Sequence, residues 1–84
     1  MNEYLMRLKI EKQKKEKDLR ELKIKIVRLL NELCRLINPY FSKIDEIRAD
    51  EIEQSADELL KTCNLAKNAE KSLKNISGDL GEND

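Results

Sequence analysis

The sequence predicts an all-α protein built as an antiparallel hairpin of two long helices, and three observations carry this prediction. Apolar residues recur at alternating spacings of three and four from Leu5 to Leu36, which places them on one side of a helix. A second series of this kind begins near residue 44. Pro39 is the only proline and lies between the two series. Because proline interrupts a helix, the two helices are expected to fold back on each other.

The first helix is expected over about residues 3–37. With Leu5 as heptad position a, eight of the ten a and d positions as far as Leu36 are aliphatic, and the two exceptions are Lys12 and Lys15. Such regularity predicts a continuous seam against the second helix. The Asn38–Pro39 step ends the helix, because a residue before proline is disfavoured in the α conformation.

The second helix is expected over about residues 43–77, after a turn at 38–42, with a possible break or phase shift at 48–50. Ile44 and Ile47 lie out of phase with the later apolar series, so residues 39–48 either form a separate short helix or belong to one helix with a phase shift. We expect the continuous helix. Its seam would contain Ala49, Ile52, Ala56, Leu59, Cys63, Ala66, Glu70 and Leu73.

Gly78 is the expected residue just past the end of the second helix. Residues 1–78 would form a single domain, and residues 79–84 a flexible acidic tail. In a hairpin that turns near residue 41, the numbers of facing residues add to 81–82. This register would place Leu29 opposite Ile52 and, near the open end, Lys12 opposite Glu70.

Charge is balanced over the 84 residues but uneven along them. Residues 1–37 hold 11 Lys and Arg against 6 Asp and Glu, a net charge of +5, and residues 38–84 hold 6 against 11, a net charge of −5. A basic first helix and an acidic second helix favour pairing with each other. The aromatic content of 4% and the charged content of 40% suit helical bundles and coiled coils.

The residues that usually carry catalysis are scarce. The chain has no histidine, and its two cysteines do not make a zinc site. We therefore expect no enzyme activity, no cofactor, no metal and no small-molecule substrate. No apolar run reaches the length of about 20 residues that spans a bilayer, and the N-terminus lacks the apolar core of a signal peptide. The expectations are no membrane partner, reduced thiols and a cytoplasmic location.

The hairpin seam does not use all the apolar residues. Between Ile26 and Ile37 the apolar face of the first helix widens beyond the a and d positions, and contiguous apolar patches usually mark an interface. We expect a homodimer that forms a four-helix bundle, or a different helical protein in the same groove. The protein would act as an adaptor, regulator or assembly element. The candidate interface residues are Val27, Leu30, Cys34, Ile37, Ile44, Ile47 and Leu60.

The alternative function uses a basic stripe on the first helix. Between Lys9 and Lys25 there are eight basic residues against four acidic ones, and such a stripe could bind an acidic protein or the phosphates of a nucleic acid. No aromatic side chains lie among them for base stacking, and this disfavours a nucleic-acid-associated regulator. The candidate stripe residues are Lys9, Lys14, Lys17, Arg20 and Lys23.

Overall fold

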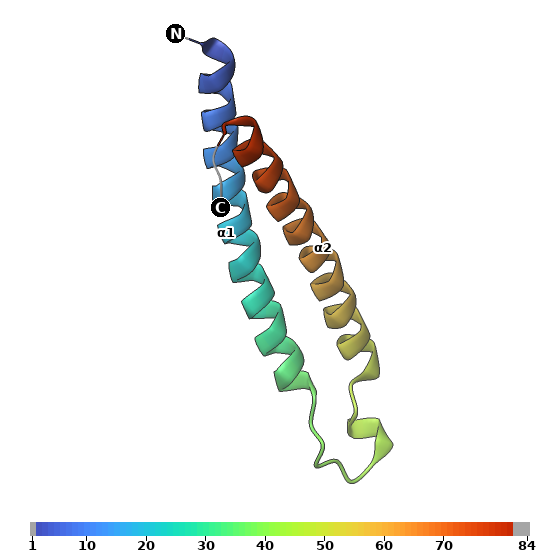
Figure 1. The fold of residues 1–84 in the computed structure, drawn as a ribbon. Helices are drawn as coiled ribbons and strands as arrows, with labels where there is room; N and C mark the ends of the chain where they lie inside the picture. The colour runs from blue at the N-terminus through green and yellow to red at the C-terminus, as the bar shows by residue number, and fades with distance from the viewer. Residues whose placement is uncertain (1, 82–84) are drawn as a thin grey trace.

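The computed structural model describes residues 2–81 and contains two long antiparallel helices (Figure 1). Helix α1 spans Glu3–Leu36, a 3-10 turn η1 spans Ile44–Glu46, and helix α2 spans Ala49–Asp79. The molecule is elongated, with extents of 68 × 18 × 14 Å. The all-α hairpin expected from the sequence is therefore confirmed. The first turns of α1 project beyond the end of α2 (Figure 1).

Helix α1 begins with a side-chain cap. The Oδ1 atom of Asn2 accepts a hydrogen bond of 3.0 Å from the backbone N–H of Tyr4, which satisfies one of the free donors at a helix start. The helix ends at Leu36, because Ile37 has the extended conformation that precedes Asn38–Pro39. The four buried residues of α1 all belong to the predicted seam: Leu8, Leu19, Leu29 and Leu36.

The loop between the helices is held by hydrogen bonds from side chains to nearby backbone. Asn38 Oδ1 accepts from the N–H of Tyr40 at 2.9 Å, and Glu46 Oε2 accepts from the N–H of Ser42 at 3.0 Å. Such bonds compete with helix formation. As a result, residues 37–48 contain only the 3-10 turn, and α2 begins at Ala49. The expectation of one continuous helix from about residue 43 is wrong.

The seam of α2 differs from the predicted one at every second position. Its members are spaced by three and four residues and are buried or half-buried: Ile52, Ser55, Leu59, Thr62, Ala66, Ala69, Leu73, Ile76 and Leu80. The predicted members Ala56 and Glu70 are exposed. The observed seam buries Ile76, which gains about 1.5–3 kcal/mol from burial, and leaves the Glu70 carboxylate in water.

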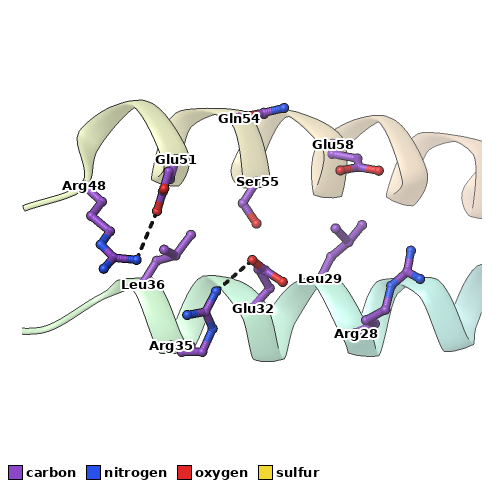
Figure 2. Close-up of a pocket in the computed structure, with 10 residues that line it drawn as sticks. All are labelled: Arg28, Leu29, Glu32, Arg35, Leu36, Arg48, Glu51, Gln54, Ser55 and Glu58. Atoms are coloured by element: carbon purple, nitrogen blue, oxygen red, sulfur yellow. Dashed lines mark hydrogen bonds and ion pairs between the residues drawn. The ribbon is translucent and has the colours of Figure 1, made fainter.

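The helix register is about one heptad away from the predicted one. Leu36 and Ile52 line the same small cavity beside the loop, whereas the prediction paired Ile52 with Leu29. Figure 2 shows Ser55 of α2 between Leu29 and Leu36 of α1. In this register Leu36 is buried and Leu5, at the projecting end of α1, is 40% exposed. The predicted turn was too short, because the chain spends residues 37–48 outside both helices.

Helix α2 ends at a glycine, but at a different one from the predicted Gly78. Gly78 is helical, and Gly81 has a φ of 76°, a conformation that disfavours residues with a Cβ atom. The N–H of Gly81 donates to the carbonyl of Gly78 at 3.0 Å. Asp79 still belongs to α2 and Leu80 is half-buried. The rest of the expected acidic tail, 82–84, lies outside the described residues.

Candidate interaction surface

An ion pair between the helices shows which side chains share each side of the hairpin. Lys25 Nζ lies 3.5 Å from Glu58 Oε1. Both residues directly precede a seam residue at the same heptad position, so these positions border one side of the seam. Residues that directly follow the alternate seam positions, such as Leu30 on α1 and Ala56 on α2, consequently border the other side. The hairpin thus has two different flanks.

One flank is apolar along the half of the hairpin nearest the loop. We call it the apolar flank, and all of its members are exposed. The exposed fraction is 57% for Val27 and 45% for Leu30 on α1, 56% for Ile37 just after α1, and 60% for Leu60 on α2. Large aliphatic side chains exposed next to one another are unusual on a monomer and mark sites of interaction. The apolar flank consists of Val27, Leu30 and Cys34 of α1, Ile37 directly after α1, and Ala56 and Leu60 of α2.

Apolar residues of the loop extend this surface. Ile44 is 72% exposed and Ile47 is 37% exposed. Ile47 and Ile37 also line the cavity of about 210 Å³ at the loop end of the seam. All seven residues that the sequence predicts as an interface therefore reach solvent. Four of them lie on the two helices, and Ile37, Ile44 and Ile47 lie in the connection between the helices. Their role in binding stays a prediction.

The five residues of the predicted basic stripe are exposed on α1. They do not form one narrow line, because their sequence spacing spreads them over about half of the helix circumference at about 100° per residue. Lys9, Arg20 and Lys23 continue the apolar flank toward the open end of the hairpin. Lys17 lies on the outer face, and Lys14 lies still further round, at the heptad position of Arg28 and Arg35 on the side of the polar flank. A nucleic-acid role for these residues stays a prediction.

The other flank is polar and contains a cavity of about 540 Å³ between the two helices (Figure 2). Within it, Arg35 pairs with Glu32 at 3.0 Å and Arg48 pairs with Glu51 at 3.5 Å. The ten residues that line the cavity carry three arginines and three glutamates, so their formal charges cancel. We call this side the polar flank; its lining residues are Arg28, Leu29, Glu32, Arg35, Leu36, Arg48, Glu51, Gln54, Ser55 and Glu58.

Two hydroxyl groups lie in the seam, and sequence reasoning missed both. Thr62 is 2% exposed, and its Oγ1 donates to the carbonyl of Glu58 at 2.8 Å. Ser55 is 7% exposed, and its Oγ has no hydrogen-bond partner among the described residues. A buried hydroxyl without a hydrogen-bond partner destabilises the fold, because it has lost its hydrogen bonds to water and gained none within the protein. A search that accepts small polar residues at heptad spacing would have found these two positions.

Within residues 2–81 no group of three or more Cys, Asp and Glu side chains is arranged to hold a metal ion. None of the helices described is both long enough and apolar enough to cross a membrane. Comparisons with models of protein families, with curated proteins and with solved structures give no match. The fold and its two flanks are therefore the basis for a functional proposal.

Proposed function

We propose that this protein is a non-enzymatic protein-binding module, an adaptor, regulator or assembly element, and that the apolar flank is its binding surface. The observation that carries the proposal is the exposure of Val27, Leu30, Ile37 and Leu60, at positions that helix geometry places on the same flank of the hairpin. Covering apolar surface contributes about 25 cal/mol per Å². A partner that covers these side chains would therefore gain several times the energy of an exposed ion pair.

The spacing of the flank favours a helical partner. Val27, Leu30, Cys34 and Ile37 follow one another at three, four and three residues, the same spacing as a heptad seam. They form a second stripe beside the one that packs on α2. Such a stripe fits the knobs of another amphipathic helix. The polar flank has no comparable stripe, since ion-paired side chains occupy it.

The small core of the hairpin also favours a partner. Among the described residues, six hydrophobic residues are buried, with 6–9% of their surface still exposed to solvent, and no side chain is completely shielded from solvent. Two of the nine seam positions of α2 hold hydroxyl side chains. Scaffolds of this size usually need a metal, a disulfide or association with another chain for stability. Association with another chain through the apolar flank would supply this stability.

Two leucines provide a matched experiment. Leu60, on the apolar flank, is 60% exposed and Leu65 is 57% exposed, but the two lie about 140° apart around α2. Leu60→Gln should reduce association, whereas Leu65→Gln should leave it unchanged. Molar mass by light scattering, together with recovery of bound proteins from native lysate, measures both kinds of partner. Circular dichroism verifies that both variants stay helical.

Equal behaviour of Leu60→Gln, Leu65→Gln and the wild-type protein in both assays would contradict the proposed function. Loss of a captured protein with Leu60→Gln alone would support it, even when the wild-type chain is monomeric. Loss of a self-associated form with Leu60→Gln alone would also support it. The two results differ only in the identity of the partner.

A further inference from the structure

We infer that the partner of the apolar flank is an amphipathic helix of a different protein, in which an apolar stripe is followed along the helix by acidic side chains. The inference rests on the proposed function, because it describes the partner of the same surface. Its grounds are the basic residues that lie beyond the apolar flank and the small side chains beside the seam of α2.

Beyond the apolar flank, toward the open end, the same side of the hairpin is basic. Residues that directly follow a seam residue lie on this side of both helices. After the seam residues within 8–22 and 62–80, these positions hold five basic residues against Glu16 and Glu70, a net charge of 5 − 2 = +3. All five basic residues are exposed. We call them the basic extension: Lys9, Arg20 and Lys23 of α1 with Lys67 and Lys74 of α2.

This positive charge belongs to one side of the open half and not to all of it. Before the same seam residues, on the side of the polar flank, the sequence holds three basic residues against four acidic ones, a net charge of −1. The ion pairs within residues 2–81 that hold Lys25, Arg35, Arg48 and Lys61 include no residue of the basic extension. Its charges are therefore available to a partner.

The side chains beside the seam leave room for a third helix. Ala56 and Cys63 are the residues of α2 closest to the seam on this side, and both are small, whereas Leu30 of α1 is large. Helices pack closely where large side chains of one meet small side chains of another. From Lys9 to Ile37 the surface is about 42 Å long at 1.5 Å per residue, the length of a partner helix of about 28 residues.

The partner has to match both parts of this surface. Apolar side chains would cover Leu30 and Leu60, and carboxylates further along the same helix would lie beside Lys23 and Lys67. Each exposed ion pair is weak, but a row of them makes an acidic helix favourable and a basic helix unfavourable at this site. A nucleic acid would neutralise the basic extension and leave the apolar residues uncovered.

A second copy of this chain does not offer the required pattern on either flank of residues 2–81. Its own apolar flank is followed by the basic extension. Its polar flank has no apolar stripe, since ion-paired side chains occupy it. Neither flank therefore joins an apolar stripe to an acidic one, and the partner is a different protein.

Two synthetic helical peptides of about 28 residues test the inference. One carries leucines at heptad spacing in one half and glutamates in the other half, and the second carries lysine in place of each glutamate. Each peptide is made with the apolar half at either end. In fluorescence anisotropy the wild-type protein should bind the glutamate peptide at least about tenfold more tightly than the lysine peptide.

Charge reversal assigns this preference to the basic extension. Lys23→Glu with Lys67→Glu should bind the lysine peptide more tightly than the glutamate peptide. The control is Arg7→Glu with Lys14→Glu, which makes the same change in net charge at exposed positions on the other side of the seam and should keep the wild-type preference. Leu60→Gln should weaken the binding of both peptides. Circular dichroism verifies that all the variants stay helical.

Equal affinity of the wild-type protein for the two peptides would overturn the inference, and so would an equal effect of the two charge-reversal variants. If Leu60→Gln still weakened the binding in either case, the proposed function would stand. A wild-type protein that binds neither peptide and self-associates through Leu60 would also overturn the inference and leave the proposed function standing.

Discussion

Lys25 of α1 and Glu58 of α2 lie on the same side of the hairpin, with 3.5 Å between Nζ and Oε1. Their side chains are 41% and 50% exposed, so this pair contributes at most about 1 kcal/mol to stability. Its importance is positional. These two residues mark the side of the seam that faces the polar flank. Aliphatic residues on the other side of the seam, such as Leu30, therefore belong to the apolar flank.

Ser55→Ala is expected to stabilise the protein. The Ser55 hydroxyl is buried without a hydrogen-bond partner among the described residues, and alanine is also the better helix former. The free energy of unfolding in urea should rise by about 0.5–1.5 kcal/mol. The control is Thr62→Ala, which removes a hydroxyl that donates to the Glu58 carbonyl and should destabilise. A loss of stability in Ser55→Ala would contradict this view of the seam.

The two glycines near the end of α2 are expected to respond in opposite directions to alanine. Apart from the adjoining backbone, neither has an atom within 4 Å of the position that a Cβ would occupy. The backbone conformation therefore decides whether alanine is favourable. Gly78 is helical, and Gly78→Ala should stabilise by about 0.5–1 kcal/mol. Gly81 has a φ of 76°, and Gly81→Ala should destabilise by about 1 kcal/mol. Thermal unfolding measures both; a shift of the same sign would refute the assigned helix end.

The two thiols should not form a disulfide within one chain. In the observed register Cys34 faces about residue 54, nine residues from Cys63, which is about 13 Å along the helix. A disulfide needs Cα atoms within about 7 Å. Mild oxidation followed by peptide mapping should find no Cys34–Cys63 bond in monomeric folded protein. Such a bond would require a different packing of the helices.

The hairpin itself was predictable because its evidence is local. Seam residues such as Leu19, Leu29 and Leu36 recur at a strict spacing over 30 residues, and Asn38–Pro39 ends the helix by steric exclusion. The exposed apolar residues were predictable for the same reason. Leu30 and Ile37 lie outside the seam spacing, so one partner helix leaves them uncovered.

The register and half of the α2 seam were not predictable by the same reasoning. Apolar character favoured Ala56 over Ser55, yet the helix can turn only one face to α1. Ile76 further along α2 decides which face is buried. The register depended on the loop length, and loop hydrogen bonds such as Asn38 with Tyr40 leave no apolar pattern. The orphaned Ser55 hydroxyl and the cavity beside it follow from that register.

The alkylation rate of Cys34 tests the central claim most directly. Its thiol lies on the apolar flank and is exposed in the single hairpin, and peptide mapping separates it from Cys63. At low micromolar protein concentration the thiol should react freely. At a concentration where the protein sediments in association with another chain, its rate should fall severalfold, because the proposed function places the contact on this flank. A cysteine introduced by Glu21→Cys, at an exposed position on the side of α1 that holds Arg28 and Arg35, should keep a constant rate. An unchanged Cys34 rate under conditions where the protein sediments as a dimer would show that the chains associate through another surface.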